Sequence, residues 1–557
     1  MRRRQDDRVH DLVTRLTRQR VDDPGVAVSV IRGGDVTALR YVGLANLERQ
    51  IPIGPETRFH IVSVSKTFIA ATVLILAARG ALKLDDEIRR YLPEVSAPMP
   101  VTVRHLLSMT SGLRDVLEIE RLRGVWTSSA SRRRELLDLA WRQTTMSSPP
   151  GAQYMYANVN VLLLDELVAR VSGMSADAFR RVALYEPLGL TATMARPHEG
   201  VVVSDLAEPY VPNARNGWSR ATHLLGIAAD PLTTNLGDLT RWLLALRAGA
   251  IAGVSVTTAM AERTRLRDST PIYYGLGLAV RRYRGLTVLC HTGSQPGWKA
   301  HLAYIPARDV GLVILSNRED THPAALAGTL MSAIVGDEFP EPDPAGDPGR
   351  GSKAPALAPE QISAVGGSYI DPGAGEWIAL TIKDNLLCAE TLGDPMFLYP
   401  EGGGFFRDGD DYRASVPAEL RFAFGSSPDD ITCQLNLGGQ RMALRKCSAP
   451  SYTRRELSAF TGRYQNREMA SQHMICLHDG QLSIDYAADR ANALRFVMTP
   501  IAPDIFFVRP TAPGVAHRHV FRFERNSEGM VVSVVVTMER LKGIRLLRAT
   551  DGSRACS

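Results

Sequence analysis

The stretch RFHIVSVSKTFIAATVLILAARG, residues 58–80, joins a polar motif to the longest apolar run of the chain. The run, Phe68 to Ala78, is too short to cross a bilayer, which takes about 20 residues. It predicts a buried core helix over residues 67–79 instead. Ser63-Val64-Ser65-Lys66 stands at the mouth of that helix. Because positions three apart share one helix face, the Ser63 hydroxyl and the Lys66 ammonium can meet one turn apart.

This spacing suits an activated nucleophile. A neighbouring lysine can accept or relay the proton of a serine, and a helix N-terminus favours the negative charge that develops during attack. The alternative is a serine that caps the helix and a lysine on the surface, because both residue types are common. The rest of the sequence decides between the two.

Around this stretch, strands and helices alternate in a way that indicates one α+β domain over residues 1–335. Helical patterns follow near residues 133–142 and 160–173. Strand-like segments precede and follow them, namely VAVSVIRGG (26–34), VTALRYVGLAN (36–46), LTVLC (286–290), AHLAYIP (300–306) and VGLVILSN (310–317). This order predicts an antiparallel sheet flanked by helices.

Residues 336–360 are rich in proline, glycine and charge, and they are predicted to form a linker. Short alternating segments follow it, which are typical of β-structure. The Gly-Ser-Tyr at 367–369 has a counterpart in the Gly-Arg-Tyr at 462–464, and each is followed later by an Arg-Phe pair. We therefore predict two similar antiparallel β-barrel domains, over residues 361–450 and 451–557. Chance alternation is the alternative explanation.

Composition narrows the class of protein. The chain has 557 residues, 45% hydrophobic and 22% charged, as in soluble globular proteins. Lys plus Arg number 65 against 59 Asp plus Glu, without lysine tracts, so no nucleic-acid partner is expected. The N-terminal segment MRRRQDDRVHDLVTRLTRQR carries charges where a secretory signal has its apolar core. A cytoplasmic protein with no membrane partner is the expectation.

The six cysteines form no CxxC pair and no group with histidines that would suggest zinc. They are Cys290, Cys388, Cys433, Cys447, Cys476 and Cys556. We expect no metal, no cofactor and no disulfide framework.

Two further motifs follow Ser63 and Lys66 in the chain. They are Tyr156-Ala157-Asn158 and His291-Thr292-Gly293. The ordered set S-x-x-K, Y-x-N and H-x-G resembles the penicillin-recognising serine hydrolases of peptidase family S12, relatives of class C β-lactamases and D-amino-acid peptidases. The resemblance implies a β-lactamase/transpeptidase-like catalytic domain.

Tyr156 and Asn158 have chemical roles that suit this setting. A phenol beside two cationic groups would have its ionised form favoured, and Tyr156 could then shuttle the proton between Ser63 and the leaving group. Asn158 can donate an amide hydrogen bond to the substrate carbonyl, or contact Lys66. The structural alternatives are a buried aromatic residue and a plain turn residue.

His291 stands where β-lactamases of this family usually carry lysine, and this disfavours a β-lactamase. Gly293 lets the backbone approach a substrate closely. The resemblance implies that the amide of Ser294 and the amide of Ser63 form the oxyanion hole, which needs two preorganised donors. Cys290, next to His291, is interpreted as a small buried residue and not as a second nucleophile.

Two barrels after an H-x-G domain resemble the D-aminopeptidases, as do YGLGL at 274–278 and PGW at 296–298. This implies release of N-terminal D-residues of the D-alanine type from small peptides, amides or esters, inhibition by β-lactams, and a homodimer by analogy. An esterase or a D-amino-acid amidase on the same site is one alternative. A penicillin-binding sensor that acylates with little turnover is another.

One segment departs from that subfamily. D-aminopeptidases carry an acidic residue on a loop of the last barrel, where it helps to hold the substrate ammonium. The matching segment here, residues 508–514, is shorter and lacks the acid. Arg509 lies in it as a candidate substrate-binding residue that would repel an ammonium group. Asp504 is a candidate replacement for the missing acid.

Overall fold

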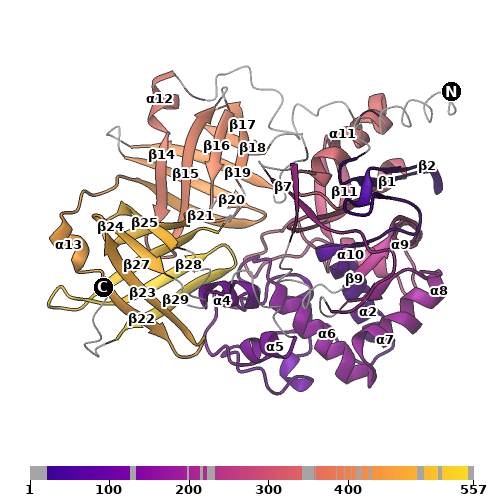
Figure 1. Ribbon diagram of the computed structural model, residues 1–557, viewed down its shortest axis with the longest axis horizontal. Helices are drawn as coiled ribbons and strands as arrows, with labels where there is room; N and C mark the ends of the chain where they lie inside the picture. Colours follow the sequence, from indigo (N-terminus) through magenta and orange to yellow (C-terminus); the bar gives the residue numbers. More distant parts are fainter. Residues whose placement is uncertain are drawn as a thin grey trace.

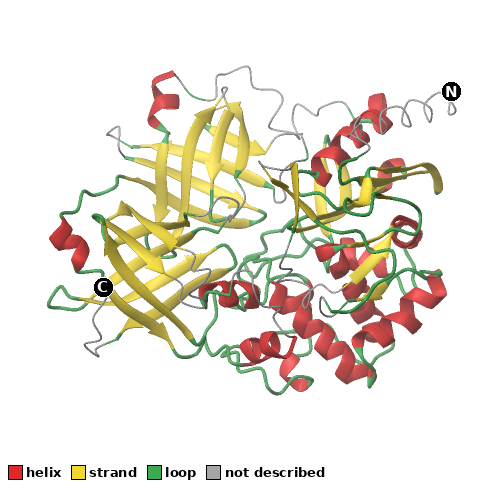
Figure 2. Cartoon of the chain, in the orientation of Figure 1, coloured by secondary structure: helices red, strands yellow, loops and turns green. Residues whose placement is uncertain are grey.

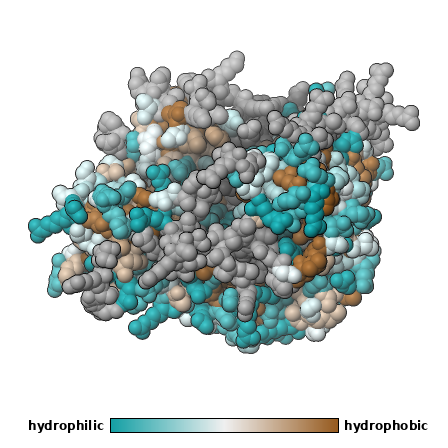
Figure 3. Space-filling view, viewed as in Figure 1, coloured by the Kyte–Doolittle hydropathy of each residue, from teal (hydrophilic) through white to brown (hydrophobic). Residues whose placement is uncertain are grey.

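The computed structural model describes residue 15 and residues 22–125, 133–196, 200–213, 217–221, 232–340, 357, 359–383, 386–393, 395–402, 404–408, 412, 417–425, 430–485, 495–511 and 517–549. Figure 1 shows an α+β domain beside two barrels. In Figure 2 the helices gather in the α+β domain, while strands dominate the barrels. The face in Figure 3 carries scattered hydrophobic patches among hydrophilic residues.

An antiparallel sheet forms the centre of the α+β domain, and within the described residues its order is β10-β11-β12-β13-β1-β2. These strands are β10 (Ala279–Tyr283), β11 (Leu286–Gln295), β12 (Trp298–Ile305), β13 (Val310–Ser316), β1 (Val26–Arg32) and β2 (Asp35–Val42). β13, with the sequence VGLVILS, is buried at every position because helices cover the central strands. The predicted antiparallel sheet is confirmed.

Helices pack against this sheet and against each other. The described helices are α2 (Ser65–Ala78), α3 (Val103–Leu107), α4 (Val116–Leu122), α5 (Arg133–Trp141), α6 (Asn158–Ser172), α7 (Ala176–Arg180), α8 (Glu186–Leu188), α9 (Leu236–Ala248), α10 (Val256–Ala261) and α11 (Pro323–Val335). α2 is buried along nearly its whole length, as a helix that is apolar on all sides must be. The predicted core helix is confirmed, two residues earlier than expected at its start.

Shorter strands complete the domain. They are β3 (Leu44–Asn46) with β4 (Ile51–Pro52), β5 (Arg58–His60) with β9 (Leu232–Asn235) and β6 (Met194–Ala195), and β7 (Tyr210–Asn213) with β8 (Gly217–Arg220). β5 leads directly into the turn before α2. Its pairing with β9 therefore fixes where α2 begins.

Both predicted barrels are confirmed as closed eight-stranded antiparallel barrels. The first barrel contains β14 (Gly367–Asp371), β15 (Glu376–Lys383), β16 (Leu386–Glu390), β17 (Met396–Gly402), β18 (Phe405–Asp408), β19 (Ala418–Phe424), β20 (Ile431–Leu437) and β21 (Gln440–Cys447). The last barrel contains β22 (Gly462–Asn466), β23 (Ser471–His478), β24 (Gln481–Asp485), β25 (Arg495–Ala502), β26 (Ile505–Pro510), β27 (His519–Arg525), β28 (Val531–Met538) and β29 (Leu541–Arg548).

Equivalent contacts recur in the two barrels. Tyr369 and Tyr464 are fully buried, and each phenol donates to the carbonyl four residues earlier, at 3.0 and 2.9 Å. Each ring lies near the phenylalanine of the later Arg-Phe pair, Phe422 in one barrel and Phe523 in the other. A short helix precedes each barrel, α12 (Pro359–Ala364) or α13 (Arg454–Ser458). These shared contacts support duplication over chance alternation.

The expected linker, residues 336–360, lies mostly outside the described residues, which omit 341–356 and 358. One cysteine departs from expectation: Cys476 is disulfide-bonded. Cys290, Cys388, Cys433 and Cys447 are free thiols. Within the described part of the chain, no helix is both long and apolar enough to span a membrane, and no group of three His, Cys, Asp or Glu side chains could hold a metal ion.

The two barrels differ in how their cores are connected. Buried residues of the last barrel, Phe460 and Tyr464 among them, form one continuous hydrophobic cluster with the α+β domain. The first barrel has a separate cluster of its own, around Tyr369. A third cluster joins the barrels to each other, and in it Trp377 stacks on Phe507 with ring centroids 4.1 Å apart.

Candidate active site

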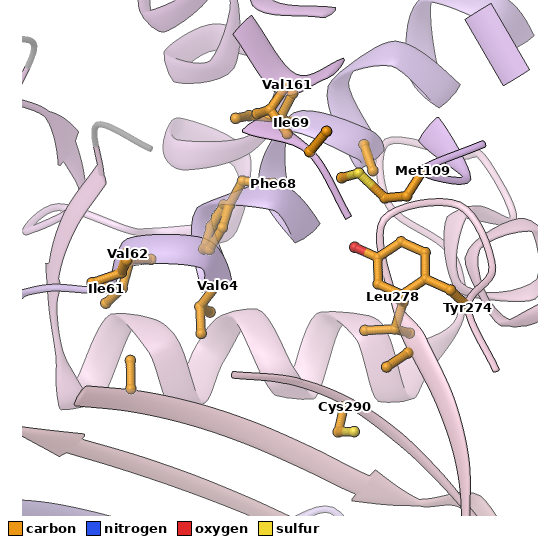
Figure 4. Close-up of a cluster of buried hydrophobic side chains, with 14 of the residues drawn as sticks. Ile61, Val62, Val64, Phe68, Ile69, Met109, Val161, Tyr274, Leu278 and Cys290 are labelled. Carbon is orange, nitrogen blue, oxygen red and sulfur yellow. The ribbon is translucent and has the colours of Figure 1, made fainter. Parts of the chain in front are cut away.

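Ser63 lies in a short 3-10 turn, η1 (Val62–Val64), immediately before α2. Val62 has a φ of 48°. A β-branched residue with positive φ is a strained outlier, and such strain gathers at functional sites. Figure 4 shows apolar side chains around this turn, including Ile61, Val64 and Phe68. They hold the strained turn in place, so Ser63 is presented from a rigid support.

Lys66 faces Ser63 from the first turn of α2. Its side chain is buried, and Nζ donates to Ser63 Oγ at 3.0 Å and to Asn158 Oδ1 at 3.1 Å. The alternative of a surface lysine therefore does not apply. One ammonium group bridges the S-x-x-K and Y-x-N motifs, which lie 92 residues apart in the chain.

Tyr156 precedes α6 and is half-buried. The Nζ atom of Lys66 lies 4.9 Å from its ring centroid, and the guanidinium carbon of Arg540 lies 5.1 Å from the same centroid. The two cationic groups that the sequence argument required are thus both present. The second comes from the last barrel, and the sequence did not indicate it.

Asn158 is the first residue of α6, and a hydrogen bond to Asp115 fixes its position. The Asn158 backbone N–H donates to Asp115 Oδ2. The other oxygen of Asp115 caps α4 by accepting from the N–H groups of Leu117 and Glu118, at 2.9 and 3.3 Å. Sequence reasoning missed Asp115, although an aspartate directly before an apolar helix is an N-cap signal.

β11 presents a backbone edge to the nucleophile. β12 pairs with β11 from Leu289 to Gln295, but among the described strands β10 pairs with it only as far as Cys290. A Cβ atom on Gly293 would lie 2.3 Å from the Ile61 carbonyl oxygen and 3.1 Å from the Ser63 nitrogen. Only glycine allows this approach. Backbone amides of β11 can therefore serve as oxyanion donors beside Ser63, as the resemblance implied for Ser294.

His291 is buried on β11 beside the tyrosines. Nδ1 donates to the Thr292 carbonyl at 3.1 Å, and Nε2 lies 2.9 Å from the Tyr274 hydroxyl, which donates to it in the neutral imidazole. The ring centroids of His291 and Tyr156 are 6.3 Å apart. His291 thus lies close enough to share a bound ligand with Tyr156. Tyr274, from the YGLGL segment, is the contact that orients the imidazole.

The exposed end of β11 is held by an ion pair. Lys299 Nζ donates to Ser294 Oγ at 2.8 Å and to Glu319 Oε1 at 2.9 Å. Glu319 Oε2 also accepts from the Gly297 N–H at 2.7 Å. Sequence reasoning missed both Lys299 and Glu319, because their roles depend on the register of β11 and β12. They fix the turn that carries Ser294.

A buried cluster supports the other face of β11. Tyr412, between β18 and β19 of the first barrel, packs on Arg281 at 4.5 Å and on the His301 ring at 5.7 Å. Burial, Arg281 and His291 lower the pKa of His301 to about 3. Burial raises the pKa of the nearby Cys290 thiol, which agrees with its interpretation as an unreactive core residue.

Two candidates from the last barrel make no described contact with the site. Arg509 is an exposed residue of β26, and in the described part of the chain it forms no hydrogen bond or ion pair with Ser63 or Tyr156. The carboxylate of Asp504 accepts from Arg525 Nε and Nη2, at 2.9 and 2.8 Å, so it is already paired with a cation of its own barrel. Residues 512–514 of the segment 508–514, and the two residues after it, lie outside the described residues.

Known proteins are similar to this chain over most of its length. A family model described as Beta-lactamase matches residues 13–335. A D-aminopeptidase of Cereibacter sphaeroides (strain KD131) is 25% identical over 509 residues, covering 90% of this chain and 90% of that protein. Penicillin-binding protein 4* of Bacillus subtilis is 25% identical over 439 residues, covering 75% of this chain and 94% of that protein.

Solved structures give the same fold. The octameric penicillin-binding protein homologue from Pyrococcus abyssi has a TM-score of 0.54 at 21% identity, covering 79% of this chain and 99% of that one. The D-amino acid amidase from Ochrobactrum anthropi SV3 has a TM-score of 0.51 at 21% identity, covering 59% and 98%. At such identities these structures bear on the fold and not on the substrate.

Proposed function

The chain belongs to the beta-lactamase family, and on that premise we propose that this serine hydrolase is a D-aminopeptidase. It would release N-terminal D-amino acids of the D-alanine type from small peptides, amides or esters. The support is the match to D-aminopeptidases over 90% of the chain, which extends past residue 335 into the barrels. The expected sensitivity to β-lactams belongs to the same proposal.

The observation that carries the chemistry is the position of Lys66 between Ser63 and Asn158, directly beside Tyr156. A serine is a weak nucleophile unless a neighbouring group removes its proton. Both Lys66 and Tyr156 are placed to do so. The strained turn and the glycine-lined edge of β11 keep the hydroxyl oxygen and the amide donors together.

The reaction follows from these positions. Ser63 Oγ attacks the carbonyl carbon, and its proton passes to the unprotonated member of the pair, either Lys66 as a neutral amine or Tyr156 as a phenolate. The carbonyl oxygen becomes an oxyanion, held by backbone amides. Collapse breaks the scissile bond, and the leaving amine takes up the proton. Water then attacks the ester on Ser63 by the same route, releasing the D-amino acid and restoring the hydroxyl.

A stereochemical pair tests the proposal. The purified protein should hydrolyse D-alanine p-nitroanilide and leave the L-enantiomer nearly untouched. Ser63→Ala should lower kcat by at least about 10³-fold, because the nucleophile is lost. Ser65→Ala is the matched control, since Ser65 is a buried serine two residues away, and it should keep its rate. Hydrolysis of the L form alone, or an active Ser63→Ala variant, contradicts the proposal.

An esterase acting on N-blocked substrates is a second candidate, favoured by the guanidinium of Arg540 beside Tyr156, which adds positive charge near the site. D-alanine p-nitroanilide, D-alanine amide and an N-acetyl-D-alanine ester separate an aminopeptidase, an amidase and an esterase. A burst of product without a steady state would instead identify a penicillin-binding sensor.

A further inference from the structure

The turn between β28 and β29 brings the last barrel to the active site. Its backbone is docked on the α+β domain by three hydrogen bonds. The Asp115 N–H donates to the Arg540 carbonyl at 3.1 Å, and Arg114 Nε donates to the Lys542 carbonyl at 3.2 Å. The Lys542 N–H donates to Ser147 Oγ at 3.1 Å. This docking uses main-chain atoms of the turn, so its position does not depend on the side chain of Arg540.

The Arg540 side chain extends from this turn to Tyr156. Its guanidinium carbon lies 5.1 Å from the ring centroid, within the range of a cation–π contact. The side chain is partly buried, and 29% of its surface is exposed. Burial opposes its charge, but the carboxylates of Glu539, Asp115 and Glu118 outweigh burial and raise the pKa of Arg540. Arg540 is therefore a permanent cation at this ring.

The titratable groups around the ring come from different parts of the chain. Lys66 lies on α2, His291 on β11, and Arg540 on the last barrel. The rings of Tyr274 and Tyr156 meet edge to face, with their centroids 6.4 Å apart. Arg540 also interacts with three carboxylates, those of Glu539, Asp115 and Glu118. Glu118 is in turn paired with Arg121 at 2.6 Å. His517 is a further neighbour of Arg540. Burial and neighbouring cations lower the pKa of His517, so it adds no charge near neutral pH.

We propose that Arg540 is a positioning residue for Tyr156, supplied by the last barrel to the hydrolytic site. Its guanidinium holds the phenol ring beside Lys66 and favours the ionised form of the phenol, in which Tyr156 can accept the Ser63 proton. The same turn reaches the other end of the Y-x-N motif. The Arg540 carbonyl accepts from Asp115, whose carboxylate accepts from the Asn158 N–H.

This role concerns the serine-hydrolase chemistry and does not depend on the D-aminopeptidase assignment. Positioned acid–base groups contribute about 10²–10⁴-fold to a rate. Removing a cation that tunes such a group should cost part of that contribution, roughly 10- to 100-fold in kcat. Substrate affinity should change little, because Arg540 acts through Tyr156.

The test compares Arg540→Met with Arg545→Met. Arg545 lies on β29, the strand that follows the turn carrying Arg540. It is exposed and paired with Glu524 at 2.8 Å, and so provides a matched control. For Arg540→Met we expect kcat lower by roughly 10- to 100-fold, KM within about threefold, and the acidic limb of the pH profile moved to higher pH. Arg545→Met should match the wild type. Labelling of Ser63 by a fluorophosphonate should slow in the same proportion, whatever the natural substrate is.

Arg540→Lys is a second variant that keeps the test decisive if Arg540→Met does not fold. It retains the charge, so its kcat should stay within about fivefold of the wild type. A greater loss in Arg540→Lys, or an unchanged labelling rate and pH profile in folded Arg540→Met, would overturn the proposal. If fluorophosphonate labelling slows as expected while D-alanine p-nitroanilide is not hydrolysed by the wild type, Arg540 keeps its role and only the substrate assignment fails.

Discussion

The two barrels share one strand order and one buried tyrosine contact, yet they support the α+β domain in different ways. The last barrel shares a hydrophobic cluster with that domain and brings Arg540 to Tyr156. The first barrel has a separate core and places one aromatic residue, Tyr412, behind β11. A repeated fold therefore does not imply a repeated role. The last barrel reaches Tyr156, whereas the first barrel supports the strand β11.

The largest expected effect comes from removing the contact of the first barrel. Tyr412 is almost fully buried against Arg281, Tyr283 and His301. Truncation of a buried aromatic residue costs about 3–5 kcal/mol. Tyr412→Ala should therefore lower the free energy of unfolding by that amount in a urea titration, with a smaller effect on kcat than Arg540→Met. Tyr412→Phe is the control and should lose less than about 1.5 kcal/mol. Equal losses for the two variants would contradict the packing role.

Lowering the pH should destabilise the last barrel more than the first. The first barrel, residues 361–450, contains no histidine, whereas His473 and His519 are buried in the last barrel. Burial lowers the pKa of each to about 3. An unfolded histidine titrates near 6.5, so the unfolded chain binds more protons between about pH 6.5 and pH 3. Stability must fall as pH decreases through that range.

The expected loss from one such histidine between pH 7 and pH 5 is about 2 kcal/mol. Replacing His519, which stacks on Phe496 and Phe521, with phenylalanine should remove that share of the pH dependence in urea titrations at the two pH values. If His519→Phe leaves the pH dependence unaltered, His519 is not the neutral buried group described above.

The smallest effect is expected at the contact between the barrels. Lys542, next to the turn that carries Arg540, forms an ion pair with Glu376 of the first barrel, and both side chains are mostly buried. Glu376→Gln removes the charge but leaves an amide oxygen that can still accept from Lys542 Nζ. We therefore expect a loss of about 1 kcal/mol in thermal unfolding, below the roughly 3–5 kcal/mol of an unpaired buried charge, and a change in kcat below about twofold. A catalytic loss as large as that of Arg540→Met would mean that both barrels shape the site.

The sequence predicted the elements formed by local pattern. The apolar run after Lys66 indicated α2, alternation indicated the strands, and the paired Gly-x-Tyr segments indicated two barrels. The ordered motifs predicted that Ser63, Lys66, Tyr156 and His291 share one site. In the structure Lys66 contacts Ser63 and Tyr156, and His291 lies beside Tyr156. Residues placed by docking between domains were not predictable, because no periodicity marks them.

Arg540 illustrates the limit. In the last barrel the sequence pointed to Arg509, which lies in a recognisable strand, whereas the structure brings a hairpin turn to Tyr156. Tyr412 is a similar case. Its partners lie in a distant part of the chain, and only the packing of whole domains brings them together.

The order of synthesis gives the β28–β29 turn a further consequence. A nascent chain whose first 450 residues have left the ribosome already contains the strands of the antiparallel sheet, together with Ser63 and Lys66. Arg540, the second cation beside Tyr156, has not yet been translated. At about 5–20 residues per second, it follows roughly 5–20 s later. If Arg540 acts as proposed above, the full hydrolytic rate is reached only after the last barrel closes.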